Sequence, residues 1–387
     1  MPNPDALSHF ATCPRGLEAL LAGELEHLGA DALTPTAGGV AFHADTQTCY
    51  RANLESRLAT RILRRLETRS YRNEQEIYDV TRALPWSRWF KVSQSIRVDI
   101  NAHRSPLKSL DFATLRIKDA ICDRFRDDTG SRPDVDTREP DIRIRAYLDA
   151  DSITLYLDTS GEPLYKRGYR VQSVEAPLKE NLAAGIIVLS GWRPDETLLD
   201  PMCGGGTLLA EAAMMGLNIA PGAGRSFGFE RLNDYDSGTW AAVREAALAA
   251  QSRDRKLTIQ GSDLHYREVE YAKENLRAAG LAEVVQIKQA SATDLRAPAP
   301  EGVMVMNPPY GERLGEAGEL AAFYPKLGTW MKQYFAGWRC YLFTADPALP
   351  KGIRLQASKR TPLFNGAIEC RLFEYKIITG SNRREKP

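Results

Sequence analysis

Residues 197–207 of this chain read TLLDPMCGGGT. The apolar residues before Asp200 predict a short buried strand, and the apolar residues 207–215 predict a helix directly after the glycines. A strand, a glycine-rich turn and a helix in this order are typical of a doubly wound α/β sheet, whose ligands bind beyond the carboxyl ends of the strands. The glycines allow a ligand to approach the backbone closely, and the start of the helix favours an anionic group.

The spacing of this turn restricts the class of ligand. No Lys follows the glycines, so the turn does not match a triphosphate-binding P-loop. The spacing is also not the G-x-G-x-x-G of dinucleotide-binding folds. A ligand that combines a carboxylate with a nucleoside fits better, and S-adenosylmethionine is such a ligand.

Strand and helix patterns alternate from residue 178 to the end of the chain, as expected of such a sheet. The predicted helices are 178–189, 207–215, 267–279 and 323–335. The predicted strands are 197–200, 257–263, 284–288, 303–306, 340–344 and 368–378, of which the last is expected to be antiparallel and at the far side of the sheet.

Polar residues follow the predicted parallel strands. Asp200 and Asp263 end the first two, and Asp294 follows the third. Asp263 could accept hydrogen bonds from two ribose hydroxyls, and Asp294 could accept from an adenine amine. Either Asp alone is better explained as a helix cap or a turn residue. Four polar positions in order on four successive strands, with Asn307 as the last, favour a ligand site.

The fourth position begins the run Asn307-Pro308-Pro309-Tyr310. The Asn307 side-chain oxygen and the Pro308 carbonyl are two acceptors, and the Tyr310 ring offers a face for stacking. Two acceptors on the hydrogens of a conjugated amine favour a pyramidal nitrogen and free its lone pair for attack. The run therefore predicts a site for an amine on a planar group, and the alternative is a proline-rich turn.

The first 160 residues predict small α+β units. A helix is expected over 17–28, another over 112–125, and a hairpin over 142–148 and 152–158. Residues 51–72 contain seven arginines, and Leu54, Leu58, Ile62 and Leu66 recur at every fourth position. This spacing predicts an amphipathic helix whose arginines face outward, either as a solvated surface or as a patch for nucleic acid.

Composition excludes several other classes. The net charge is +1, from 51 basic and 50 acidic residues, so any nucleic-acid surface must be local. The six cysteines form no C-x-x-C pair, which argues for reduced thiols and against a zinc site. No apolar run is long enough for a membrane span, and the N-terminus lacks a signal-peptide pattern. We therefore expect a cytoplasmic protein with no metal and no membrane partner.

The sequence resembles the bacterial THUMP-domain 23S ribosomal RNA guanine-N2 methyltransferases along almost its whole length. The motifs that carry the resemblance lie at 10–18 (FATCPRGLE), 112–120 (FATLRIKDA), 164–170 (LYKRGYR), 176–183 (APLKENLA), 200–207 (DPMCGGGT), 307–315 (NPPYGERLG) and 363–372 (LFNGAIECRL). One departure is Gly205, which is often Ser in the family. Asn-Pro-Pro-Tyr alone is shared with DNA adenine and protein glutamine methyltransferases.

The resemblance implies a Rossmann-like class I methyltransferase domain with a mixed seven-stranded sheet, preceded by ferredoxin-like and THUMP modules. The implied boundaries are 1–55 for the ferredoxin-like unit, 56–160 for the RNA-binding THUMP module, 161–190 for a linker with a first helix, and 191–380 for the catalytic domain. Some relatives carry a second, fused methyltransferase, and this chain is expected to lack one. An insertion over 217–255, between the glycine turn and the next strand, also occurs in the family.

The resemblance implies transfer of methyl from S-adenosylmethionine to the exocyclic N2 of a guanine in 23S ribosomal RNA, free or in a pre-ribosomal particle. The catalytic residues would be Asn307, Pro308 and Tyr310. The cofactor residues would be Asn181, Asp200, Cys203, Gly204, Gly206, Thr207, Asp263 and Asp294. The RNA contacts would be Arg57, Arg61, Arg64, Arg65, Arg116, Lys118, Lys166 and Arg167.

Three alternatives stay open on the sequence. A transfer-RNA guanine is one, because related THUMP enzymes use it. An adenine-N6 or glutamine methyltransferase is a second, and the THUMP-like N-terminal half argues against it. A non-catalytic RNA-binding scaffold is the third, and the intact Asp200, Asp263, Asp294 and Asn307 argue against it. The sequence does not indicate the oligomeric state.

Overall fold

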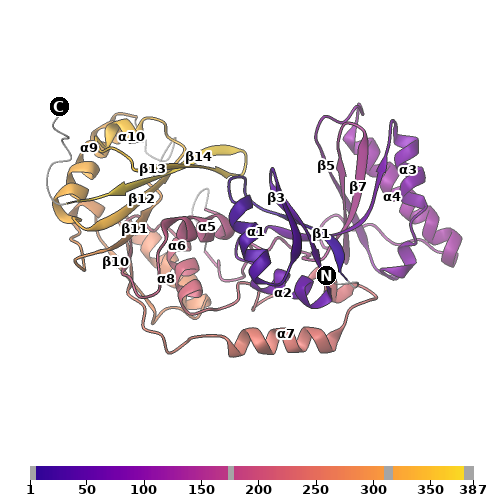
Figure 1. The fold of residues 1–387 in the computed structure, drawn as a ribbon, viewed down its shortest axis with the longest axis horizontal. Helices are drawn as coiled ribbons and strands as arrows, with labels where there is room; N and C mark the ends of the chain where they lie inside the picture. The colour runs from indigo at the N-terminus through magenta and orange to yellow at the C-terminus, as the bar shows by residue number, and fades with distance from the viewer. Residues whose placement is uncertain (1–5, 173–177, 309–316, 379–387) are drawn as a thin grey trace. The chain divides into compact units, whose positions relative to one another are not determined.

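The computed structural model describes residues 6–172, 178–308 and 317–378 (Figure 1). The chain divides into two units. The N-terminal unit contains residues 1–13, 21–164 and 222–246, and the C-terminal unit contains 14–20, 165–221 and 247–387. Among the described helices, none combines the length and hydropathy that a membrane span requires.

The N-terminal unit is built on one seven-stranded sheet of order β2-β3-β1-β4-β7-β6-β5. Its strands are β1 (Leu7–Thr12), β2 (Asp31–Thr36), β3 (Gly39–Ala44), β4 (Arg61–Ser70), β5 (Ile96–Ala102), β6 (Ile142–Leu148) and β7 (Ser152–Asp158). β4 pairs with β1 on one side and with β7 on the other. One central strand therefore joins the ferredoxin-like part of the sheet to the THUMP part.

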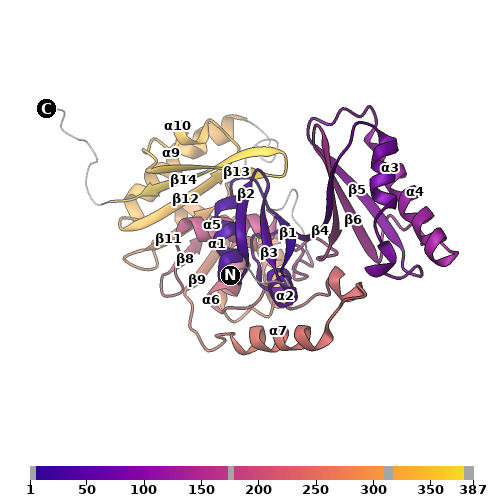
Figure 2. The ribbon, with the colours of Figure 1, turned by 45° about the vertical axis from the view of Figure 1, so that its right-hand side comes forward.

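The helices that accompany this sheet include α1 (Glu18–His27), α2 (Thr46–Glu55), α3 (Glu74–Arg82) and α4 (Leu110–Thr129). In the THUMP part, α3 and α4 lie along one side of the strands (Figure 2). The side chains on that face are the buried alternate residues of the strands, such as Ile144, Leu155 and Leu157. The predicted helices over 17–28 and 112–125, and the predicted hairpin, are present.

The helix predicted over the arginine-rich residues 51–72 is wrong. α2 ends at Glu55, where Ser56 turns to an extended backbone, and the second half of the stretch is strand β4. The half-buried Glu24 carboxylate fixes this turn, because it accepts from the Ser56 hydroxyl at 2.6 Å and from the Arg57 amide at 2.7 Å. The leucine spacing suited a helix, but pairing with strands on both sides decided the outcome.

Residues 222–246 are part of the predicted catalytic domain in sequence, yet they pack with the N-terminal unit. Tyr50 of α2 stacks on Phe229 with ring centroids 4.2 Å apart, and its hydroxyl accepts from the Asp236 amide at 3.0 Å. Arg64 of β4 pairs with Asp234 at 2.6 Å. The long insertion between the glycine turn and the next strand thus carries a helix, α7 (Ser237–Ala249), most of which belongs to the other unit.

The C-terminal unit contains a second seven-stranded sheet of order β10-β9-β8-β11-β12-β14-β13. The strands are β8 (Leu198–Asp200), β9 (Ile259–Asp263), β10 (Val285–Gln289), β11 (Gly302–Met306), β12 (Trp338–Thr344), β13 (Lys359–Asn365) and β14 (Ile368–Lys376). β8 to β12 are parallel, and β14 is antiparallel to both of its neighbours. The sheet is mixed, as predicted, but the unpredicted β13 replaces β14 at the edge.

Helices cover both faces of this sheet (Figure 1). They are α5 (Glu180–Ser190), α6 (Thr207–Gly216), α8 (Tyr266–Ala278), α9 (Ala317–Tyr334) and α10 (Leu349–Gly352). α9 and α10 contribute Leu327, Trp330, Met331 and Leu349 to a buried cluster with Met304 and Met306 of β11. This packing makes β11 fully buried, so Asn307, the next residue, leaves the sheet at a fixed place.

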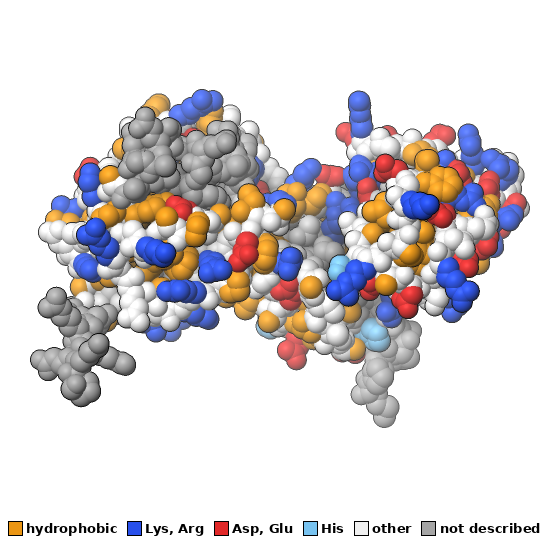
Figure 3. Space-filling model, turned by 90° about the horizontal axis from the view of Figure 1, so that it is seen from above, with side chains coloured by type: hydrophobic (Ala, Val, Ile, Leu, Met, Phe, Trp, Pro, Cys, Tyr) orange, Lys and Arg blue, Asp and Glu red, His pale blue; other side chains and the backbone are white. Residues whose placement is uncertain are grey.

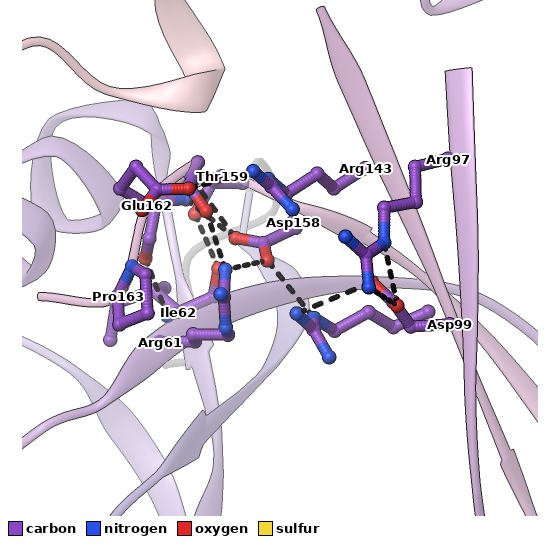
Figure 4. A network of polar contacts seen from close by, with 12 residues as sticks. Arg61, Ile62, Arg97, Asp99, Arg143, Asp158, Thr159, Glu162 and Pro163 are labelled. Atoms are coloured by element: carbon purple, nitrogen blue, oxygen red, sulfur yellow. Dashed lines mark hydrogen bonds and ion pairs between the residues drawn. The ribbon is translucent and has the colours of Figure 1, made fainter. Parts of the chain in front are cut away.

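A polar network joins β4, β5, β6 and β7 of the N-terminal sheet (Figure 4). The Asp158 side chain at the end of β7 is fully buried and accepts hydrogen bonds from Arg61 of β4 and from Arg145 of β6. Arg145 also lies 3.6 Å from Asp99 of β5. Because Asp158 further accepts from two backbone amides of the next turn, one carboxylate fixes the chain where it leaves the sheet.

Replacement of Asp158 by Ala should lower the free energy of unfolding by about 3 kcal/mol, because it leaves two largely buried arginines without their carboxylate. Chemical denaturation of the full chain would measure the change. Asp127→Ala is the matched control, since it removes an exposed Asp–Arg pair and should cost less than about 1 kcal/mol. Equal effects of the two substitutions would contradict this role of Asp158.

Candidate active site

The predicted polar positions meet at one edge of the C-terminal sheet. Asp200 of β8 pairs in register with Gly261 of β9, and Leu199 pairs with Met304 of β11. The carboxyl ends of β8, β9, β10 and β11 are therefore neighbours. The order of these strands brings Asp200, Asp263, Asp294 and Asn307 to the same edge from four separate segments of the chain.

The glycine turn after β8 has the backbone that its sequence predicts. Gly204 and Gly206 have φ angles of +49° and +79°, which residues with a side chain rarely adopt. A Cβ on Gly206 would also lie 3.1 Å from the Cβ of Ala272 on α8. Glycine is therefore required here, and the turn passes close to α8 before it enters α6.

Asp263 holds this turn in place. One of its carboxylate oxygens accepts from the Gly204 amide at 2.9 Å, and the other accepts from the His265 amide at 3.0 Å. Asp294 ends a short 3-10 helix after β10 and is exposed. Both acids lie where the sequence predicts them, and Asp263 has a second task that the sequence did not indicate.

Asn275 on α8 is a residue of this site that the sequence reasoning missed. Its side-chain NH2 donates to the carbonyls of Gly205 and Gln172, at 3.0 Å and 3.1 Å. Its side-chain oxygen accepts from the amides of Val171 and Gln172. The buried amide thus ties the glycine turn to the segment before α5. A mid-helix Asn has no motif around it, so only the structure could identify it.

A second contact steadies the same region. Arg170 pairs with Glu180 at 2.9 Å and donates to the hydroxyl of Thr207 at 3.2 Å. Thr207 is the first residue of α6, and the predicted Asn181 lies fully buried in the first turn of α5. Arg170 therefore links Glu180, the residue before Asn181, to Thr207 at the start of α6.

Burial dominates the electrostatics of the site. The Asp200 side chain is almost inaccessible, and burial, together with the nearby charge of Asp263, raises the pKa of Asp200 to about 8. Burial and the same two carboxyl groups raise the pKa of the Cys203 thiol. The thiol is therefore a neutral packing group, and Asp200 keeps its proton at neutral pH unless a bound cation lowers its pKa.

Asn307 follows β11 directly. Its side-chain oxygen is buried and has no hydrogen-bond partner among the residues that the structure describes. A buried acceptor without a partner is costly unless a ligand supplies one. Pro308 is buried beside it, while Tyr310 lies outside the described residues. The structure thus identifies one unsatisfied acceptor at the predicted catalytic position.

The structure corrects three of the predicted RNA contacts. The Arg167 side chain is 1% exposed and lies 3.4 Å from Glu211. Arg61 and Arg64 are bound to Asp158 and Asp234 within the N-terminal unit. These three arginines form ion pairs within the fold, so their guanidinium groups are not available to bind an RNA phosphate.

The other five predicted RNA contacts are at least partly accessible. Arg65 and Lys166 are exposed, and Arg57, Arg116 and Lys118 are half-buried. Arg116 lies over the Tyr78 ring at 4.2 Å, and Lys118 pairs with Asp119 at 2.6 Å. Contact of these five residues with RNA stays a prediction.

Comparison with protein families identifies three domains. Residues 8–63 match the RlmL ferredoxin-like domain, 71–158 match the THUMP domain, and 167–374 match the RMKL-like methyltransferase domain. The chain belongs to the RMKL-like methyltransferase family. Family membership confirms the predicted class I methyltransferase fold with ferredoxin-like and THUMP modules at the N-terminus.

The chain is 40% identical to the ribosomal RNA large subunit methyltransferase K/L of Shewanella sp. (strain ANA-3), over 98% of this chain and 54% of the relative. It therefore spans about half the length of the curated relatives that it matches. SMU.472, solved in complex with SAH, is 32% identical with a TM-score of 0.89, and the match covers 98% of this chain and 100% of SMU.472. That complex agrees with S-adenosylmethionine as the predicted cofactor.

A second solved structure carries a different name. The "predicted N6-adenine-specific DNA methylase" from Listeria monocytogenes str. 4b F2365 is 31% identical with a TM-score of 0.87. The match covers 96% of each chain. The name of that protein gives adenine N6 in DNA as the acceptor, whereas the K/L relatives are named for ribosomal RNA, so the fold alone does not choose the acceptor.

Asp200 makes the stability of this unit depend on pH. The folded state keeps a proton on Asp200 up to about pH 8, whereas an unfolded chain releases it near pH 4. Wild-type stability should therefore fall across this window through Asp200, and Asp200→Asn should remove that part of the fall.

Urea unfolding from about pH 4 to about pH 8 would measure the difference between Asp200→Asn and wild type. The variant should gain stability relative to wild type as the pH rises. Asp195→Asn, at an exposed position, is the control and should track wild type. A difference that stays constant with pH would contradict the assignment.

Proposed function

We propose that this chain transfers a methyl group from S-adenosylmethionine to the exocyclic N2 of a guanine in large-subunit ribosomal RNA. The observation that carries the proposal is the buried oxygen of Asn307 at the carboxyl end of β11, for which the described part of the chain provides no hydrogen-bond partner. An amine hydrogen of the target base would satisfy this acceptor. The Pro308 carbonyl would accept the second hydrogen, and Tyr310 would stack on the base.

The described residues fit S-adenosylmethionine, which supplies the methyl group when bound. The turn at Gly204–Gly206 leaves its backbone open to a close ligand, and Asp263 and Asn275 hold that turn. The Asp263 carboxylate suits the positive charges of the cofactor, and a bound cation would favour ionisation of the protonated Asp200. Asp294 is exposed after β10, where it could accept from the adenine amine.

The protein would contribute to methyl transfer mainly by positioning the reactants and by directing hydrogen-bond dipoles at the amine. Asn307 and Pro308 would orient the amine so that its lone pair faces the methyl carbon. The nitrogen–carbon bond forms as the carbon–sulfur bond breaks, and the amine then releases a proton to water. No strong base is needed, because the attacking nitrogen becomes acidic once it carries the methyl group.

Two comparisons support the choice of RNA as the methyl acceptor: the names of the relatives and the family match of the THUMP domain. The relatives named ribosomal RNA large subunit methyltransferase K/L support large-subunit RNA, and the THUMP domain supports RNA over DNA. Guanine N2 rests on the family resemblance, since Asn-Pro-Pro-Tyr serves other amines equally well. A transfer-RNA guanine is the alternative that keeps the same chemistry.

Asn307→Ala should lower kcat for methyl transfer by about a hundredfold, because it removes one oriented dipole from the reacting amine. The dissociation constant for S-adenosylmethionine should change little. Asn307→Asp keeps an acceptor oxygen and should retain more activity than the Ala variant. Single-turnover transfer to RNA and equilibrium cofactor binding would measure both quantities.

The control is Asn233→Ala, at an exposed position of the N-terminal unit, which should behave as wild type. Full methylation by Asn307→Ala with normal cofactor affinity would contradict the role of Asn307 as an acceptor for the reacting amine. Loss of cofactor binding in that variant would instead mean that Asn307 acts on the cofactor.

A further inference from the structure

Charge alone does not locate an RNA surface on the N-terminal unit. Basic and acidic side chains are interspersed over the surface at the right of Figure 3. A surface for RNA must therefore be found from an arrangement of residue types, and the face of the THUMP sheet opposite α3 and α4 has such an arrangement.

Strand pairing aligns alternating side chains on that face. Arg65 of β4 lies opposite Tyr156 of β7, which lies opposite Arg145 of β6. Toward the other end of the strands, Thr154 of β7 lies opposite Tyr147 of β6. Adjacent strands are about 4.8 Å apart, so one tyrosine has an arginine on each side.

The side chains on this face differ in accessibility. Tyr156 is half-buried near Phe10, with ring centroids 6.3 Å apart, and Thr154 shares a hydrogen bond with Thr68. Tyr147 is 40% exposed, and Arg65 is exposed. Arg65 donates to the Ser8 hydroxyl at 2.6 Å and makes no ion pair with a described carboxylate. Asn101 of β5, opposite Tyr147, adds an exposed amide. By contrast, Arg145 is paired with Asp99 and Asp158, so its main role is to fix the position of β6 beside β5 and β7.

We infer that this surface, defined by Arg65, Asn101, Tyr147, Thr154 and Tyr156, binds an unpaired RNA strand. The inference rests on the proposed action on RNA and adds the site and the form of RNA that it takes. Tyr147 stacks on a base, Arg65 contacts a phosphate, and the half-buried Tyr156 lies between Arg65 and Arg145 as part of the surface. Paired RNA hides its base faces in the helix, so this surface selects single strands over duplexes.

The two kinds of contact have separate signatures. Tyr147→Ala removes a stacked base and raises the dissociation constant for unpaired RNA about tenfold, with the dependence on salt unchanged. Arg65→Gln removes one phosphate contact and flattens the slope of log K against log salt by about 0.7. If these residues had only a structural role, the two substitutions would not separate an effect on the dissociation constant from an effect on its salt dependence.

The test uses the full chain, a labelled unpaired oligoribonucleotide and a duplex of the same sequence, with binding followed by fluorescence anisotropy over a series of salt concentrations. Matched controls lie on α4, across the sheet: Phe112→Ala at a 50% exposed aromatic and Arg126→Gln at an exposed arginine. The expected result is a loss for the sheet variants only, and tighter binding of the unpaired strand than of the duplex.

Three results would overturn the inference: wild-type affinity in both sheet variants, equal loss in the α4 variants, or equal binding of duplex and single strand with Tyr147→Ala neutral. Thermal melting of each variant excludes misfolding as the cause. Methyl transfer is measured separately, so RNA binding without transfer would fault the proposed function and not this surface.

Discussion

The site depends on how the Asp263 carboxylate holds the backbone of the glycine turn. Asp263 ends one parallel strand, and Gly204 begins the turn after the neighbouring strand, with 2.9 Å between the carboxylate and the amide. This contact fixes two strand ends to each other and brings the buried Asp200 close to a second acid. From the other side, Asn275 ties Gly205 to the segment before α5. The turn is therefore rigid before any ligand binds, which lowers the entropic cost of binding.

The N-terminal unit follows a comparable principle, in which a single strand takes part in two modules. β4 pairs with both β1 and β7, so the ferredoxin-like and THUMP parts form one continuous sheet. Asp158 secures the end of β7 to β4 and β6. The insertion over 222–246 packs on the same unit through Phe229 and Asp234. Two of the arginines that the sequence suggested as an RNA patch, Arg61 and Arg64, form ion pairs within this unit instead.

Much of the C-terminal unit could be predicted from sequence, because buried parallel strands and glycine turns leave distinct patterns. Asp200, Asp263 and Asn307 lie at strand ends as expected. β4 could not be predicted, since leucines at every fourth residue favour a helix and only long-range pairing with β1 and β7 overrides them. Asn275 was missed for a related reason: its four hydrogen bonds join segments about 70 to 104 residues away. Burial of Arg167 against Glu211 is likewise visible only after folding.

We propose that the buried side-chain oxygen of Asn307, which has no partner among the described residues, accepts a hydrogen bond from the N2 amine of a guanine in large-subunit RNA. Nucleoside mass spectrometry of ribosomal and transfer RNA, from cells that lack this protein and from cells complemented with wild type or Asn307→Ala, tests it most directly. We predict that N2-methylguanosine is lost from large-subunit RNA, returns with wild type and stays absent with Asn307→Ala. An unchanged large-subunit profile, or a loss confined to transfer RNA or to N6-methyladenosine, would contradict the claim.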